Sequence, residues 1–60
     1  MSEKYEIQKS MCEIINDNNF KEYEELIEVF REIENVGSLL GELIANDILY
    51  KDEKGIYRCK

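Results

Sequence analysis

The chain contains no histidine, no proline and no tryptophan, and it has only three glycines and two cysteines. Without histidine it lacks the residue that most often binds a metal or acts as a general base near neutral pH. Two cysteines alone do not complete a structural zinc site. We find no phosphate-cradling glycine loop and no nucleophile–base pair, and so small a chain forms few pockets for paired carboxylates. We therefore expect no enzyme activity, no cofactor and no metal.

The sequence also lacks an apolar run near the roughly 18 residues that a membrane span requires. Its first residues, Met-Ser-Glu-Lys-Tyr-Glu, have neither the basic nor the apolar stretch of a signal peptide. Linker-like, repetitive and low-complexity segments are absent. We expect a single domain, residues 1–60, in an intracellular (cytoplasmic) protein with no membrane partner.

Acidic residues dominate the charge, with 14 Asp and Glu against 8 Lys and Arg and a net charge of −6. DNA, RNA and anionic membranes repel such a chain on average. The composition favours a protein partner with a basic surface and disfavours DNA, although a local basic field can still bind it.

Two helices are expected in the first half of the chain. The first spans about 3–17; Ser2 could cap it, and a run of Asn and Asp ends it. The second spans about 20–33, because apolar residues recur there at steps of three and four. Its opposite side is a row of acids: Glu22, Glu24, Glu25, Glu28, Glu32 and Glu34.

A third helix is expected at about 36–46, with Asn35 as its N-cap. Its buried stripe comprises Val36, Leu39, Leu40, Leu43 and Ile44. Asp47 would interrupt that stripe, so the helix should end near Asn46, where Asn and Asp tolerate the left-handed conformation. Strands at about 48–51 and 56–59 then form a hairpin, and Gly55 supplies the positive φ of its turn.

The segment from Leu39 to Cys59 resembles the end of a winged helix-turn-helix domain. Members of that family often show two leucines and a third one three positions on, a helix stop before a short apolar pair, a turn with glycine, and a tyrosine near the end. The matching residues here are Leu39, Leu40, Leu43, Asn46, Asp47, Ile48, Leu49, Gly55, Tyr57 and Cys59. The resemblance implies a mainly α fold of three helices followed by a two-stranded wing. Asp47 replaces a common glycine.

In DNA-binding members of the family, the third helix enters the major groove. The corresponding face here offers no base, and Glu42 would meet the DNA without compensation. The candidate nucleic-acid-binding residues are therefore the bases of the hairpin with residues near the helix ends: Lys21, Ser38, Lys51, Lys54, Arg58 and Lys60. A solvated hairpin without a partner is the alternative.

Two features suggest protein contacts. The acidic row contributes Glu24, Glu25, Glu28 and Glu32, and a small-residue edge of the third helix contributes Gly37, Gly41 and Ala45. The alternatives are a solvated acidic face and a close crossing of the second helix over the glycines. Ile7, Met11, Ile14 and Val29 lie on or near the edges of wide apolar arcs and are candidates for a homodimer contact.

Cys12 and Cys59 lie far apart in the chain. Three interpretations stay open: the two cysteines are reduced core residues, they form a disulfide between the first helix and the last strand, or they have a redox role.

The sequence is compatible with three functions. The first is a non-catalytic interaction module in transcription or replication control that acts through protein contacts. The second is a dimeric DNA-binding transcriptional regulator that uses the N-terminus of the third helix and the basic wing. The third is a domain that only dimerises.

Overall fold

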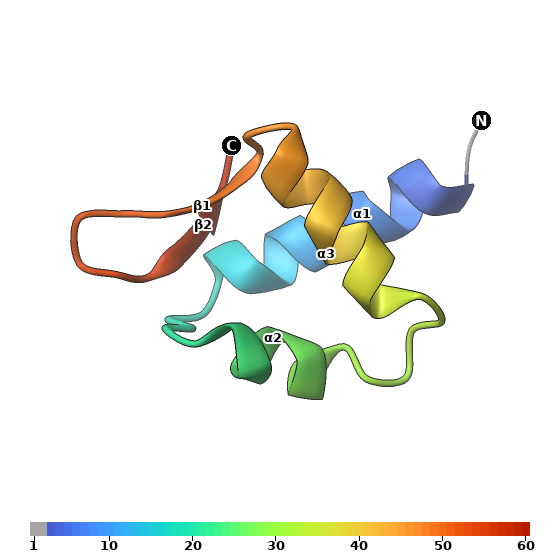
Figure 1. Ribbon diagram of the computed structural model, residues 1–60, viewed down its shortest axis with the longest axis horizontal. Helices are drawn as coiled ribbons and strands as arrows, with labels where there is room; N and C mark the ends of the chain where they lie inside the picture. Colours follow the sequence, from blue (N-terminus) through green and yellow to red (C-terminus); the bar gives the residue numbers. More distant parts are fainter. Residues whose placement is uncertain (1–2) are drawn as a thin grey trace.

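The computed structural model describes residues 3–60 and contains three helices followed by a hairpin (Figure 1). The elements are α1 (Glu3–Asn16), α2 (Tyr23–Val29), α3 (Val36–Ala45), β1 (Leu49–Lys51) and β2 (Tyr57–Cys59). This order confirms the mainly α fold with a two-stranded wing that the winged-helix resemblance implied. The proposed cap Ser2 lies outside the described residues.

All three helices and both strands contribute to one core. Its buried side chains are Met11, Ile15, Leu26, Phe30, Leu39, Leu40, Leu43, Leu49 and Cys59. Since every element places at least one residue there, burial of this cluster holds the helices and the hairpin together. Ile44 was expected in the buried stripe of α3, but it is 44% exposed. The three leucines are buried, and Val36 packs against the core in a half-buried position.

The second helix is much shorter than the expected 20–33. The Glu25 carboxylate accepts hydrogen bonds from the backbone N–H groups of Lys21 and Glu22, at 2.9 Å each, and so caps a helix that begins at Tyr23. Beyond Val29 the chain continues in turns, and Phe30 is still buried without a further helical turn. Turns and a helix can satisfy the same apolar spacing, which is why periodicity alone overestimated the length.

Left-handed residues bound the third helix. Asn35 precedes it with φ 62°, and its side chain makes no capping hydrogen bond, so its position was predicted correctly but not its role. After Ala45 the chain reverses through Asp47, whose φ is 59°. The N–H groups of Asp47 and Ile48 donate to the carbonyl oxygens of Ile44 and Leu43, at 3.0 and 2.9 Å. This Schellman arrangement confirms the expected helix end.

The hairpin pairs Leu49 with Cys59 and Lys51 with Tyr57 in antiparallel register. Asp52 organises the turn, since its carboxylate accepts the N–H groups of Lys54 at 2.9 Å and Ile56 at 3.0 Å. The Ile56 hydrogen bond is the main cause of a lowered pKa for Asp52. Gly55 has φ 77°, as the turn prediction required.

The hairpin is fastened to the end of α1 and to the segment that follows it. The Asn16 side chain accepts the Cys59 N–H at 2.8 Å and donates to the Cys59 carbonyl at 3.1 Å. The Tyr57 N–H donates to the Phe20 carbonyl at 2.8 Å. Since two strands alone are only marginally stable, these bonds help to hold the hairpin against α1 and the segment after it.

We expect Gly41→Ala to raise the free energy of unfolding by about 0.5–1 kcal/mol, because a Cβ placed at Gly41 meets no atom within 4 Å and glycine costs helical stability. Urea unfolding followed by circular dichroism measures the change. Gly55→Ala is the control and should lower stability by roughly 1–2 kcal/mol, because its φ is positive. A destabilising Gly41→Ala would contradict an open glycine edge.

We expect Asn16→Ala to lower the free energy of unfolding by about 1–3 kcal/mol, because the Cys59 backbone loses both partners in a half-buried position. Asn46→Ala, an exposed substitution of the same kind near another helix end, should change it by less than about 0.5 kcal/mol. The same urea titration compares the two. Equal effects would mean that Asn16 does not fasten the hairpin.

Candidate interaction surfaces

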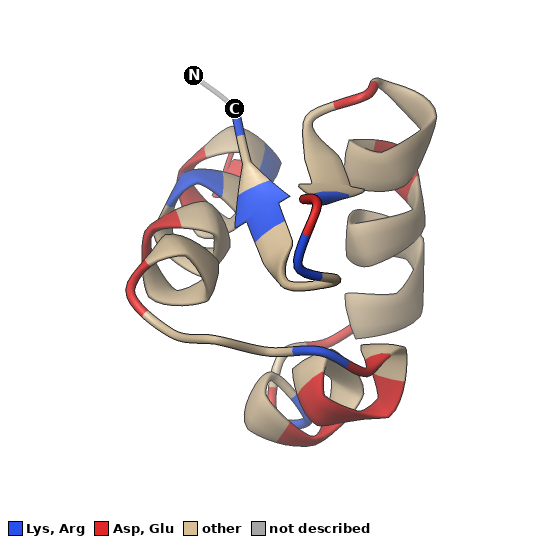
Figure 2. Ribbon diagram, turned by 90° about the vertical axis from the view of Figure 1, so that its left-hand side faces the viewer, with Lys and Arg blue, Asp and Glu red and all other residues tan. Residues whose placement is uncertain are grey.

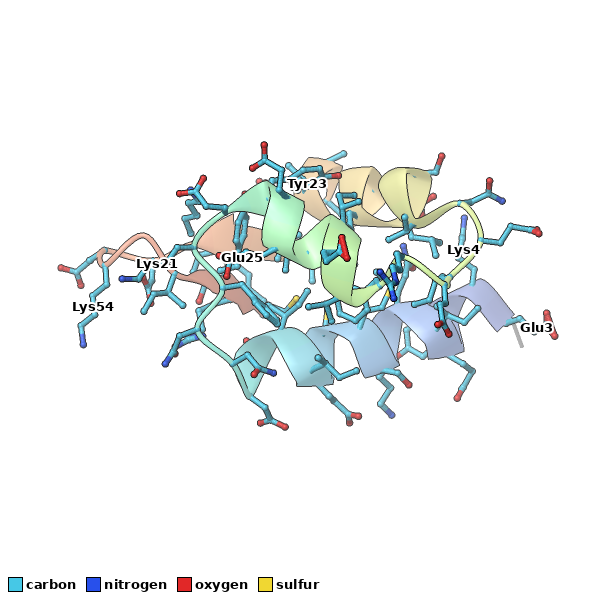
Figure 3. The ribbon with its side chains drawn as sticks, turned by 90° about the horizontal axis from the view of Figure 1, so that it is seen from below. Glu3, Lys4, Lys21, Tyr23, Glu25 and Lys54 are labelled. Carbon is cyan, nitrogen blue, oxygen red and sulfur yellow. The ribbon has the colours of Figure 1, made fainter. Side chains whose placement is uncertain are left out.

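Most of the candidate nucleic-acid-binding bases lie at the hairpin end of the molecule. Lys21 follows Phe20, whose carbonyl binds the hairpin, and Figure 3 places Lys21 and Lys54 at the same end. Both side chains belong to exposed residues. Ser38 lies in the first turn of α3, whereas the hairpin follows the other end of that helix. The structure therefore brings Lys21 to the wing bases but leaves Ser38 apart from them.

Arg58 is occupied within the fold. Its guanidinium donates to the Asn18 carbonyl at 2.8 Å and to the Asn19 side chain at 3.2 Å, and it lies 3.8 Å from the Asp52 carboxylate. Its side chain is 29% exposed. These partners make Arg58 a bridge between the wing and the segment after α1, a role that charge counting from the sequence missed.

Two further wing bases lie over aromatic rings. The Lys51 ammonium is 5.1 Å from the centroid of the Tyr57 ring, and the Lys60 ammonium is 6.0 Å from that of Tyr50. Such cation–π contacts are weak at exposed sites. Both ammonium groups therefore remain able to exchange these contacts for a ligand.

Acidic residues gather on α2, as the red segments of Figure 2 show, but the expected row on one helix face is shorter than predicted, because Glu32 and Glu34 lie in the turns after Val29. Within residues 3–60, the carboxylates differ in how far they are engaged. Glu25 caps the helix, and Glu28 forms a 2.9 Å ion pair with Arg31. Glu24 and Glu32 are exposed and make no hydrogen bond or ion pair within the described chain. The row is therefore only partly neutralised.

A shallow depression of about 460 Å³ lies beside this row. It is lined by Phe20 and Val29 together with Glu24, Glu25 and Glu28. Val29 is 48% exposed. The α2 surface thus combines an apolar centre with an acidic border, a combination that suits a partner with apolar and basic groups.

The outward face of α3 is small and uncharged. Gly37, Ser38, Gly41, Ile44 and Ala45 are exposed, and a Cβ at either glycine would meet no atom within 4 Å. The expected close crossing of the second helix over the glycines is therefore wrong. The short α2 never reaches this edge.

Glu42 is the acid of α3, and it is engaged by α1. Its carboxylate lies 3.1 Å from the Lys4 ammonium and accepts a hydrogen bond from Gln8 at 3.5 Å. α3 carries no lysine or arginine. Its surface offers no positive charge to a phosphate backbone.

The four candidate dimer residues separate into two places. Ile7 and Ile14 are 38% and 42% exposed on α1, and Met11 lies between them but is only 1% exposed. Val29 belongs to the α2 depression instead. Ile7, Met11 and Ile14 therefore share a surface, in which Met11 can only form the floor.

Cys12 and Cys59 are free thiols that come close together where α1 meets β2. Burial, reinforced by the neighbouring Cys12, raises the pKa of Cys59 to about 12. Cys12 is half-buried and lines a pocket of about 250 Å³ with Tyr5, Lys9 and Ile48.

No cluster of three or more Cys, Asp or Glu side chains suited to a metal ion occurs among residues 3–60. Among the same residues, no helix has the length and apolar character needed to cross a membrane.

Comparison with known proteins identifies one family. Residues 1–56 match the family described as replication protein RepB, C-terminal. No curated protein and no solved structure matches the chain significantly. The family match covers all three helices and the hairpin turn.

We expect Cys59 to be unreactive in the native protein. A thiol with a pKa of about 12 has almost no thiolate at pH 8, so alkylation should be about a thousandfold or more slower than for an exposed thiol. A Cys12→Ser variant isolates the Cys59 signal, and mass spectrometry after iodoacetamide treatment measures it with and without urea. Rapid labelling without urea would contradict burial of this thiol.

The same pKa makes stability depend on alkaline pH. The unfolded chain loses the Cys59 proton near pH 8.5, whereas the folded chain keeps it until about pH 12. The folded state therefore binds more protons in this window, and the free energy of unfolding should fall as the pH rises through it. A Cys59→Ala variant should show a smaller decline in urea titrations between pH 8 and 10.

Proposed function

The chain belongs to the family of the C-terminal region of the replication protein RepB, and we propose that it is a non-catalytic module of replication control that acts by binding another protein. Family membership links the chain to replication. The mode of action is our proposal, and it rests on the distribution of charge over the fold.

The uncharged outer face of α3 is the observation that carries this proposal. A winged helix that reads DNA bases needs hydrogen-bonding or basic side chains on this helix, and a bidentate arginine contributes about 1–3 kcal/mol of discrimination. Here the exposed positions are mainly glycine, alanine, serine and isoleucine. The net charge of −6 also opposes approach to a phosphate backbone.

The surface best suited to a partner is α2 with its acidic row. The carboxylates of Glu24 on α2 and of Glu32 in the turns after it make no hydrogen bond or ion pair within residues 3–60, and the depression beside Glu24 exposes Val29. A basic protein surface would gain Coulomb attraction there and would bury the apolar centre. Since replication takes place inside the cell, the proposal includes an intracellular location.

DNA binding through the hairpin end is the second candidate. It is favoured by one observation: the Phe20–Tyr57 hydrogen bond brings Lys21 to the end that carries Lys51, Lys54 and Lys60. Asp52 and Glu53 in the same turn and the internal use of Arg58 weaken this basic field. A dimer through α1 that serves only as a structural support is the third candidate.

We expect the protein not to bind random-sequence duplex DNA in fluorescence anisotropy at about 50 mM salt, where phosphate contacts are strongest. Binding that weakens steeply, by tenfold or more, between about 50 and 200 mM salt would overturn the proposal in favour of the wing. A Lys51→Gln, Lys54→Gln double variant would then identify the wing as the DNA-binding surface by losing most of that affinity.

The protein surface is tested with decalysine as a simple basic probe. We expect its addition to shift the backbone amide signals of α2 in nuclear magnetic resonance spectra. A Glu24→Gln, Glu32→Gln variant should bind it roughly 2- to 30-fold more weakly, since each exposed pair contributes about 0.2–1 kcal/mol. Glu53→Gln, Asp47→Asn is the control with an equal change of charge elsewhere. Equal weakening by both variants would mean that net charge alone is responsible.

A further inference from the structure

A groove of about 460 Å³ lies between α1 and the segment that follows α2. Eight residues line it: Glu6, Ile7, Ser10, Met11, Ile14, Phe30, Ile33 and Glu34. Met11 and Phe30 form a closed floor, being only 1% and 4% exposed, whereas Ile7 and Ile14 are 38% and 42% exposed. The middle of the groove is apolar, and its polar groups are carboxylates and one hydroxyl.

The side of the groove that faces α1 is formed by residues that follow α2. The helix ends at Val29, and the turns after Phe30, which carry the chain to α3, contribute Ile33 and Glu34. Two exposed isoleucines on one helix face are left without cover in the single chain.

Its length fits a short helix. From Glu6 to Ile14 the groove follows α1 for about two turns, or roughly 12 Å at 1.5 Å per residue. A second helix lying in such a groove presents apolar side chains at i, i+3 or i+4, and i+7, which span the same distance.

The acidic side chains around the groove indicate which kind of partner it can bind. Glu6 and Glu34 lie on its border, and neither forms a hydrogen bond or an ion pair with residues 3–60. Glu13 lies two turns from Glu6 on the same face of α1. Arg31, in the segment after α2, is already paired with Glu28. A second copy of the chain would bring like charges together, whereas a basic partner would neutralise them.

We propose that this groove binds an amphipathic helix of a partner protein, whose apolar side chains contact Met11, Phe30 and the two isoleucines while flanking lysines or arginines pair with Glu6 and Glu34. The inference rests on the proposed protein-binding function and adds a second contact site, apart from the α2 depression, with a defined ligand.

The probe is a synthetic 14-residue peptide of leucine and lysine with its leucines on one helical face. The comparison peptide has the same composition in scrambled order, so that charge is constant and only amphipathicity differs. Nuclear magnetic resonance titration of the full chain should give methyl shifts at Ile7, Ile14 and Ile33. The amphipathic peptide should bind at least about tenfold more tightly than the scrambled one.

Two matched variants locate the contact. Ile14→Ser removes one wall of the groove, and Ile44→Ser makes the same change on α3, where the side chain is equally exposed at 44% against 42%. We expect Ile14→Ser to weaken peptide binding at least about fivefold and Ile44→Ser to leave it unchanged. Circular dichroism checks that both variants keep the fold.

Three results would overturn the groove assignment. Equal affinity for the amphipathic and scrambled peptides would show that the groove does not recognise an amphipathic helix. Shifts confined to α2 would leave the proposed protein-binding function intact but place the contact elsewhere. A dimer in light scattering at about 100 μM that Ile14→Ser dissociates would make a second copy the occupant. Steep salt-dependent DNA binding in the anisotropy assay would instead remove the proposed function itself.

Discussion

The two hydrogen bonds between the Asn16 side chain and the backbone of Cys59 are the contact on which much of this small fold depends. A free two-stranded hairpin is only marginally stable in water. The amide group of Asn16 offers a donor and an acceptor in the spacing of a strand edge, and the Phe20 carbonyl extends the pairing to Tyr57. The hairpin is thereby held against α1, Leu49 and Cys59 enter the core, and the Cys59 thiol is buried beside Cys12.

The same attachment decides how the charges of the chain are used. It brings Lys21 to the wing and lets Arg58 reach Asn18 and Asn19. The Arg58 guanidinium therefore forms hydrogen bonds within the fold and is less available to a ligand. At the other end of α2 no comparable contact forms. Capping by the Glu25 carboxylate fixes where the helix begins, and the Glu24 and Glu32 carboxylates make no hydrogen bond or ion pair in the described chain. Phe30, Ile33 and Glu34, which follow the early end of the helix, line one side of the groove beside α1.

The acidic side chains therefore fall into two groups. Some form hydrogen bonds or ion pairs within the fold, and others are exposed and can bind a partner. Glu25, Glu28, Glu42 and Asp52 are engaged by the fold. The other acids of this region, among them Glu24, Glu32, Glu6 and Glu34, are exposed, and under our proposal a basic partner would form ion pairs with them while covering nearby apolar side chains. This division, more than the net charge, is the physical ground on which we propose protein binding for this member of a replication protein family.

The conformational preferences of individual residues made a large part of this structure predictable from the sequence. The stop at Asp47, the positive φ of Gly55 and the strand pair that follows depend on the conformational preferences of single residues, so they were predictable. Periodicity and the turn residues predicted the order of three helices and a hairpin, and the family resemblance supplied the fold class. Periodicity could not predict where α2 ends, because Phe30 can be buried either by a continued helix or by the turns that the structure shows. Nor could it show that no other segment packs against the glycines of α3. The groove, the hydrogen bonds of Arg58 and the proximity of the two free cysteines each involve residues far apart in the chain. Tertiary structure alone decided these features, because they depend on which segments meet once the core has closed.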